Sequence, residues 1–536
     1  MGLLTKIEDR PTPRNVYNWR VYFSSAVAAF AAVMIGYDSA FIGGTIALPS
    51  FKAEFGLDRL AAAEVNFLSA NIVSCYQAGC FFGALFGYPI GQLWGRKKGL
   101  MFAAAVFVLG AGLMLGANAQ RGLGILYAGR AIAGLGIGCA SNLTPIYIAE
   151  VAPPAIRGRL VGLYELGWQI GGLVGFWINY GVNKGMPAGH SQWLVPFAVQ
   201  LIPGGLMGLG CIFIRESPRW LFSKGRRPEA VANLCWIRNL AQDDAYIVEE
   251  IDAMDRQHRE QLATVGDGFG APFRAVFTNR ELVKRLALGG SLFIWQNGSG
   301  INAINYYSPT VFKSIGVVGT SASLLTTGIF GVIKTAVTIV WLLYLVDHAG
   351  RKVMLLIGSL GGGLCMYAVG AYIAISKPAE HSAAAGKLSS GGIAAMFFFY
   401  LWTAFYTPSW NGTPWVVNAE IFDQHVRTLT QASCAANNWF WNFMVSRFTP
   451  QMFAAMGYGV YVFFATLMLL AIPYVWLLLP ETKNVPLEDM DALFAPGVKR
   501  WKAHAIVMRE VRSRTGMETG ASEGGGKPAG GWVEDA

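Results

Sequence analysis

Long apolar runs recur along the chain from Val21 to Leu479, and short polar stretches separate them. Because a helix needs roughly 20 residues to cross the hydrocarbon of a bilayer, this pattern predicts an all-α membrane protein with about twelve spans and little soluble chain. The expected organisation is an N-terminal arm at 1–20, a six-helix half at 21–221, a central loop with helices at 222–282, a second six-helix half at 283–480, and a partly disordered tail at 481–536.

The composition agrees with this pattern. Only 14% of the 536 residues are charged and 54% are hydrophobic, whereas roughly a quarter of an average soluble protein is charged. The net charge of +10 does not indicate a nucleic-acid partner, because the basic residues lie in loops on alternate sides of the predicted spans. By the positive-inside rule both termini face the cytoplasm, and the expected partner of the chain's surface is the lipid bilayer.

Nothing in the sequence favours an enzyme. No nucleophile, base and orienting group recur at a plausible spacing, and no cluster has the spacing of metal ligands. The cysteines fall mostly inside apolar runs, where they are expected to pack as small hydrophobic residues. We therefore expect no catalytic activity, no cofactor and no bound metal.

A polar island interrupts one apolar run at residues 295–309, WQNGSGINAINYYSP. Its amides, Gln296, Asn297, Asn302 and Asn305, would each cost several kcal/mol in hydrocarbon unless they face a ligand or a wet cavity. Gln296 lies about two helical turns before Asn302, so a continuous helix would place these amides on one face. Amides both donate and accept hydrogen bonds, which suits a ligand rich in hydroxyl groups. The alternative is that they join neighbouring helices.

Four charged side chains lie at membrane depth: Asp38, Arg130, Glu165 and Lys334. An intramembrane charge costs about 3 kcal/mol or more, so each is a functional candidate. Asp38 and Arg130 reach similar depth on spans of opposite direction, and we expect them to pair. Breaking such a pair favours protonation of the carboxylate and so links proton binding to conformation; the alternative is a permanently closed structural pair. Lys334 either meets a carboxylate on a substrate or pairs with Glu165.

The second half of the chain repeats features of the first in the same order. The tripeptide GRK begins at Gly95 and again at Gly350, and Glu-Ser after the sixth span recurs as Glu-Thr after the twelfth. A duplicated six-span unit with parallel repeats explains this order. The repeated charged residues are expected at cytoplasmic ends, where they could hold an inner gate closed or simply pair at the surface. The gate candidates are Arg96, Glu150, Arg157, Glu216, Arg219, Arg351, Glu420, Arg427 and Glu481.

Motifs spread over the chain up to about Phe494 carry a family resemblance. They include GYDSAFIGG, GRAIAGLGIG, PIYIAEVAPPAIRG, RESPRWL, GSGINAINYYS, PWVVNAEIF and LPETKNVPLEDMDALF. Together they resemble the sugar porter family of the major facilitator superfamily, which implies two six-helix halves. The longer strings YELGWQIGGLVGFWINYG and FYLWTAFYTPSWNGTPWVVNAEIFDQ are similar to those of fungal quinate permeases. This resemblance implies secondary active transport, with proton symport of quinate across the plasma membrane for quinate catabolism.

The resemblance also implies roles for single residues. Asp38 matches the proton site of proton-coupled sugar porters, and Arg130 matches its partner. Gln296 and Asn302 match substrate-binding amides of the seventh span. The remaining candidates for substrate binding on the seventh, tenth and eleventh spans are Asn297, Asn305, Trp415, Asn438 and Asn442.

Two departures from the family pattern bear on the substrate. Glu165 stands where sugar porters place a binding glutamine in span five, with Gln169 one turn later as a further candidate, and Lys334 stands where they commonly have an asparagine. Both departures fit an anionic polyol, whose carboxylate would meet Lys334. One proton per quinate anion would be electroneutral, and a second proton, on Glu165, would make transport electrogenic.

Two other functions stay open from the sequence. A proton symporter of a neutral sugar or related polyol would share most of these motifs, and a nutrient sensor would bind without transporting. Lys6 in the N-terminal arm is a candidate for ubiquitin-directed turnover.

Overall fold

The computed structural model describes residues 12–264, 266, 268–346, 348–378, 388–422, 424–483, 485, 487–495 and 497–514. Every regular element in these ranges is a helix. Lys6 and the glycine-rich end of the tail lie outside them, so turnover through Lys6 stays a prediction.

The first half contributes six crossings. They are α1 (Trp19–Ala47), α3 (Ala62–Leu93), α4 (Arg96–Met114), α5 (Gly124–Val151), α6 (Arg157–Gly185) and the pair α7 (His190–Val199) and α8 (Leu201–Phe213). The short α2 (Pro49–Glu54) follows α1, and η1 (Arg14–Val16) and η2 (Pro154–Ile156) precede α1 and α6.

The second half repeats this arrangement with two interrupted spans. Its crossings are α13 (Arg280–Gly298) with α14 (Ile301–Ile315), α15 (Thr320–Val340) with η3 (Trp341–Leu345), α16 (Arg351–Ser376), α18 (Ser390–Tyr406) with η4 (Thr407–Asn411) and α19 (Thr413–Glu420), α20 (Gln424–Met456) and α21 (Gly459–Leu478). Gly300 between α13 and α14 has φ +85°, a left-handed conformation that ends one helix before the next begins. The segment η4 is a π-helix, which inserts an extra residue into its turn.

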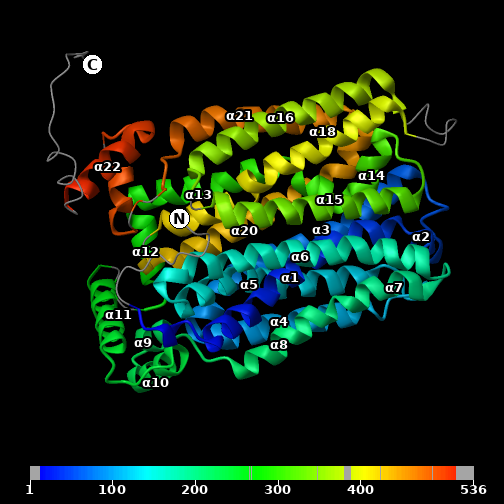
Figure 1. Cartoon of the computed structure of the whole chain (residues 1–536). Helices are drawn as coiled ribbons and strands as arrows, with labels where there is room; N and C mark the ends of the chain where they lie inside the picture. The colour runs from blue at the N-terminus through cyan, green and yellow to red at the C-terminus, as the bar shows by residue number, and fades with distance from the viewer. Residues whose placement is uncertain are drawn as a thin grey trace, which may run out of the picture.

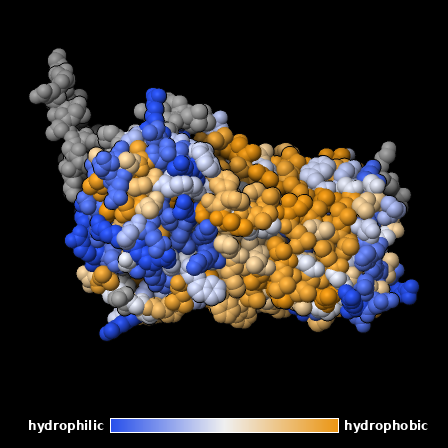
Figure 2. All heavy atoms as spheres, turned by 90° about the horizontal axis from the view of Figure 1, so that it is seen from below, coloured by the Kyte–Doolittle hydropathy of each residue, from blue (hydrophilic) through white to orange (hydrophobic). Residues whose placement is uncertain are grey.

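The two halves lie side by side as an elongated bundle with polar ends. Helices α9 (Pro218–Ser223), α10 (Arg227–Arg238), α11 (Ala245–Thr264) and α12 (Ala271–Thr278) gather at one end with η5 (Leu487–Phe494) and α22 (Arg500–Arg514), while α2 lies at the other (Figure 1). We call these the α9 end and the α2 end. Figure 2 shows a hydrophobic belt between two hydrophilic ends, the surface expected of a chain that crosses a bilayer.

Eight helices within the described ranges are long and apolar enough to cross a membrane by length and composition. The four crossings that fall short of that criterion are α6, α13–α14, α18–α19 and α20. Each of them carries buried amide or charged side chains. These spans can hold polar residues because part of their surface faces protein rather than lipid.

An acidic side chain orders the α2 end. The Glu54 carboxylate accepts a hydrogen bond of 2.8 Å from Trp193 Nε1, and its other oxygen lies 2.8 Å from His190 Nδ1. Burial alone would raise the pKa of Glu54, but the bonds from Trp193 and His190 outweigh it and hold the pKa below its usual value. These contacts tie α2 to the start of α7.

Candidate functional site

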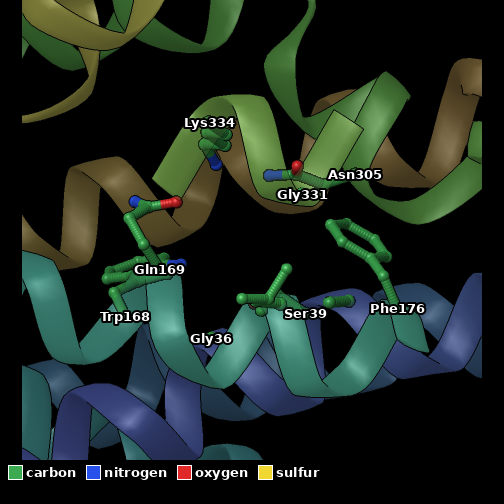
Figure 3. A pocket seen from close by; sticks show the side chains of 11 residues that line it. Gly36, Ser39, Trp168, Gln169, Phe176, Asn305, Gly331 and Lys334 are labelled. Atoms are coloured by element: carbon green, nitrogen blue, oxygen red, sulfur yellow. The ribbon is translucent and has the colours of Figure 1, made fainter. Parts of the chain in front are cut away.

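A small cavity lies between the two halves in the middle of the bundle (Figure 3). Its walls come from α1 and α6 of the first half and from α14 and α15 of the second. The predicted site residues that line it are Gln169, Asn305 and Lys334, together with Ser39, Trp168 and Phe176. The volume that the centre of a water molecule could occupy is about 10 Å³, so the cavity holds about one water molecule. The halves are therefore closed around the cavity.

Lys334 directs its charge into this cavity. The side chain is 5% exposed, and Figure 3 shows it pointing from α15 toward Gln169 on α6. Its ammonium makes no hydrogen bond to any described residue and is not within salt-bridge distance of a carboxylate. The opposite charge that attracts it is Glu165, across the boundary between the halves. A buried ammonium in this position can bind an anion that enters the cavity.

Glu165 is held by amides from both halves. Its Oε1 accepts a 2.7 Å hydrogen bond from Gln169 Nε2, one turn along α6, and another from Asn411 Nδ2 of η4. Asn411 was not predicted as a site residue, because the residues TPSWNG do not indicate a π-helix. The extra residue of that π-helix turns the amide toward the first half.

Asp38 and Arg130 form the predicted pair. Arg130 Nη1 donates to Asp38 Oδ1 at 2.7 Å, and both side chains are completely buried. The guanidinium also lies over the ring of Tyr76, 4.9 Å from its centroid. Among the described residues, Asp38 Oδ2 and two of the three guanidinium nitrogens have no hydrogen-bond partner. A buried pair joined by one hydrogen bond is poorly satisfied, so protonation of Asp38 can break it more easily than a bidentate pair.

The amides of the polar island do not share one face, so that prediction is wrong. The left-handed residue Gly300 separates Gln296 from Asn302 and changes the direction of the chain. Gln296 Nε2 donates to the carbonyls of Trp410 and Asn411 at 2.8 Å each, where it satisfies carbonyls near the irregular η4 turn. Asn305 faces the cavity instead, and its Oδ1 has no partner in the described part of the chain.

The other predicted amides bind one another. Asn302 Nδ2 donates to Asn297 Oδ1 at 2.5 Å, and Asn297 Nδ2 donates to Asn438 Oδ1 at 3.1 Å. This chain of amides joins α14, α13 and α20 in the closed conformation. Asn442, one turn beyond Asn438, is buried and its Oδ1 has no partner within the described ranges. It is therefore available to a ligand that reaches this part of α20.

Aromatic rings border the cavity where the halves meet. Trp168 of α6 stacks on Trp439 of α20 with ring centroids 6.4 Å apart and an interplanar angle of 9°. Trp415 packs against Phe293 at 4.7 Å and contacts the hydrophobic clusters of both halves. Trp168 was not among the predicted site residues, although it lines the cavity. Its position directly before Gln169, a predicted site residue, could have indicated it.

The gate candidates form two matching arrangements at the α9 end, one in each half. In the first half, Arg96 pairs with Glu150 at 2.9 Å, and Glu216 accepts the backbone N–H groups of Arg96 and Lys97 at the start of α4. Gly95 has φ +97°, and a Cβ there would lie 2.3 Å from Glu216 Oε2. The position therefore requires glycine.

The second half reproduces these contacts. Arg351 pairs with Glu420 at 2.9 Å, and Glu481 accepts the backbone N–H groups of Arg351 and Lys352 at the start of α16. Thr482 Oγ1 also donates to Glu420 at 2.6 Å. All of these contacts lie within one half.

The remaining gate candidates lie at the same end. Arg219 and Arg427 both lie close enough to Arg157 to repel its charge, with Arg157 in the first half and Arg427 in the second. Tyr88 of α3 donates to the carbonyl of Phe269 at 3.0 Å and packs edge-on against Phe273. These contacts join α3 to the α12 region at the α9 end.

Comparison with known proteins identifies the family. The family model described as "Sugar (and other) transporter" matches residues 24–494. A probable quinate permease of Aspergillus niger is 64% identical over 511 residues, which are 95% of this chain and 94% of the relative. A probable quinate permease of Neosartorya fischeri is 62% identical over 512 residues, 96% of this chain and 94% of the relative.

Solved structures show the same fold. The proton:xylose symporter XylE bound to 6-bromo-6-deoxy-D-glucose matches with a TM-score of 0.74 and 28% identity, over 89% of this chain and 99% of that one. The inward-open xylose transporter XylE from E. coli matches with a TM-score of 0.68 and 27% identity, over 89% of this chain and 100% of that one. By TM-score this chain is thus more similar to the ligand-bound structure than to the inward-open one.

These findings confirm the resemblance seen in the sequence motifs and the fold of two six-helix halves. They also confirm that the protein is a transporter rather than an enzyme, because the relatives are named permeases and the structural neighbours transport small molecules. The chain therefore belongs to the family of sugar and other transporters, the sugar porters of the major facilitator superfamily.

Proposed function

We propose that this chain imports quinate together with protons across the plasma membrane. The observation that carries the proposal is the buried ammonium of Lys334, which faces the cavity between the halves and has no hydrogen-bonded partner among the described residues. A neutral sugar gives such a charge nothing to neutralise, whereas the carboxylate of quinate does. The names of the relatives from Aspergillus niger and Neosartorya fischeri support the same substrate.

The other cavity residues suit the rest of the substrate. Asn305 offers an unpaired acceptor, Gln169 offers an amide, and Trp168 offers an apolar surface for the ring. A hydrogen bond that involves a charged group contributes about 1.5–3 kcal/mol, so removal of the Lys334 charge should weaken quinate binding roughly 10- to 150-fold. Gln296, Asn297, Asn302, Asn438 and Asn442 are proposed to reach the substrate once the halves move apart, as is Trp415.

Proton coupling is proposed to reside in Asp38 and Arg130. Asp38 lies between Gly36 and Ser39, two residues of α1 that line the cavity. When a proton neutralises Asp38, the single bond to Arg130 is weakened and the α1–α5 contact can rearrange at the cavity wall. The structural similarity to a proton:xylose symporter supports this mode of coupling.

The orientation follows from the distribution of basic residues. Loops at the α9 end carry Arg96, Lys97, Lys98, Arg157, Arg159, Arg351 and Lys352. By the positive-inside rule we assign this end, and with it both termini, to the cytoplasm. The α2 end then faces the outside.

The charged pairs at the α9 end are proposed to stiffen each half rather than to join the halves. Because Arg96–Glu150 and Arg351–Glu420 each lie within one half, each half can move as one body around the cavity. The inner gate is proposed to lie in the contacts of Tyr88 with the α12 region.

Uptake of labelled quinate by transporter-deficient cells that express this chain tests the proposal. We expect uptake to collapse when a protonophore removes the proton gradient. Asp38→Asn should lose accumulation but still exchange external for internal quinate, because it removes coupling without removing Lys334. Lys334→Gln should raise the KM for quinate.

A labelled neutral hexose and the matched variant Lys284→Gln serve as controls. Lys284 is exposed and pairs with Glu281 away from the cavity, so its loss should leave uptake unchanged. Transport of the hexose instead of quinate would refute the substrate assignment, and quinate uptake that ignores the protonophore would refute the coupling.

A further inference from the structure

Glu165 and Lys334 form a charge-neutral site that spans the two halves. Glu165 on α6 is 9% exposed and Lys334 on α15 is 5% exposed. They attract each other, but they are not in salt-bridge contact. The cavity lined by Lys334 lies beside them, and its small size keeps bulk water away.

Entry of an anion changes the charge of this site. With Glu165 ionised and Lys334 protonated the local charge is zero, and a bound carboxylate would bring it to minus one. An uncompensated buried ion costs several kcal/mol, and the two carboxylates would compete for one ammonium. Uptake of a proton by Glu165 returns the site to neutrality and leaves Lys334 to the substrate.

The surroundings of Glu165 accept both protonation states. Its two hydrogen-bond partners are the side-chain amides of Gln169 and Asn411. Each amide can donate N–H to a carboxylate or turn its oxygen to accept the O–H of a carboxylic acid. An arginine or a backbone N–H could only donate, and would hold the carboxylate ionised.

Few other charges act on Glu165. The groups that reach it from neighbouring elements are Lys334 on α15 and the phenol of Tyr406 on α18, and Tyr164 lies beside it on α6. Asp38 and Arg130 on α1 and α5 neutralise each other. Of these groups, Glu165 is the carboxylate that can take up a compensating proton beside Lys334.

We propose that Glu165 takes up a second proton each time the substrate carboxylate binds beside Lys334, so that two protons accompany one quinate anion. This inference rests on the proposed function. One proton comes from the external solution to Asp38 and one to Glu165, and both leave to the cytoplasm with the substrate. Each cycle then moves a net charge of plus one inward, and the membrane potential contributes to accumulation.

Purified protein in liposomes tests this stoichiometry. A potassium gradient with valinomycin sets the potential independently of the pH gradient, and labelled quinate reports uptake. With one net charge moved, an inside-negative potential of about 100 mV should raise the accumulation ratio of the wild type about fifty-fold. Glu165→Gln should still respond to a pH gradient but no longer to the potential. Glu64→Gln, an exposed change at the start of α3, should respond as the wild type does.

The results separate the inference from the proposed function. Quinate uptake by the wild type that ignores the potential overturns the two-proton stoichiometry, as does a Glu165→Gln variant that keeps the full response to potential. Absence of quinate uptake under any gradient overturns the proposed function itself. If Glu165→Gln does not fold, the reversal potential of the wild type still distinguishes the two stoichiometries, because two protons per quinate and one proton per quinate predict different values.

Discussion

The contact between Gly43 and Tyr306 predicts how the cavity is closed toward the α2 end. Gly43 on α1 lies one turn beyond Ser39, and Tyr306 on α14 follows Asn305, so the contact joins the halves just outside two cavity residues. A Cβ at position 43 would lie 2.0 Å from the carbonyl oxygen of Tyr306. Gly43→Ala should therefore push α1 and α14 apart.

The size of the effect follows from that distance. An ordinary contact begins at 3.4 Å, so the two helices must separate by more than 1 Å, and a backbone carbonyl cannot turn aside as a flexible side chain can. Overpacking of this kind costs about 1–3 kcal/mol. Because the cost falls only on the conformation in which the halves touch here, it should shift the equilibrium toward opening at the α2 end by roughly 5- to 150-fold.

An introduced cysteine measures this opening. Ser39→Cys in a background without the native cysteines should react with an impermeant maleimide in intact cells only when the α2 end is open. Adding Gly43→Ala should raise the labelling rate and lower the uptake rate.

Two further glycines separate opening from loss of stability. Gly83→Ala meets the carbonyl of Leu135 at 2.2 Å within the first half, so it should lower the melting temperature without raising the labelling of position 39. Gly181→Ala meets nothing within 4 Å and should change neither. Wild-type labelling and uptake in Gly43→Ala would refute the reasoning that this contact closes the cavity.

Two predictions concern the ends of the bundle. Because the folded protein lowers the pKa of Glu54, the contribution of Glu54 to stability is present above the unfolded pKa and is lost as pH falls through the folded pKa. The melting temperature of Glu54→Gln should therefore be below that of the wild type near pH 7, and the difference should shrink as the pH is lowered. Asp58→Asn, an exposed change of equal charge, serves as the control. Glu216→Ala removes the hydrogen bonds to the first N–H groups of α4 and should lower the free energy of unfolding by about 0.5–2 kcal/mol. Glu229→Ala, a change at an exposed site, should lower it less. Equal melting temperatures of Glu216→Ala and the wild type would show that these hydrogen bonds do not stabilise the protein.

Much of this architecture is encoded in patterns that a sequence displays directly. The depth of Asp38 and Arg130 on antiparallel spans predicts their salt bridge, because helix geometry fixes depth from residue number. The repeated GRK and the acidic residue after spans six and twelve predict a duplicated unit, and Glu216 and Glu481 occupy equivalent positions at the starts of α4 and α16. Both predictions rest on regular helices.

Where the helices are irregular, the sequence is a poor guide. A shared face for Gln296 and Asn302 assumes one continuous helix, and the left-handed Gly300 removes that continuity. The position of Asn411 depends on a π-helix at η4, a rare type of turn that the residues of this segment did not predict. Both irregular turns come from the second half, and both direct amides toward carbonyls or charges in neighbouring elements.

The spans that look least like membrane helices contribute a large part of the site. Of the four crossings that fall short of the apolar criterion, α6 and α14 line the cavity, η4 supplies an amide to Glu165, and α20 supplies the tryptophan that stacks on Trp168. A polar residue on a span is tolerated only where it avoids lipid, and a boundary between halves that must separate during transport is such a place. A predicted span with low hydropathy therefore indicates which helices line the transport path. By the same reasoning, Lys334 stands out because its span, α15, meets the apolar criterion. Lys334 is the one charged residue between Thr320 and Val340, so a partner of opposite charge must come from another helix or from the substrate.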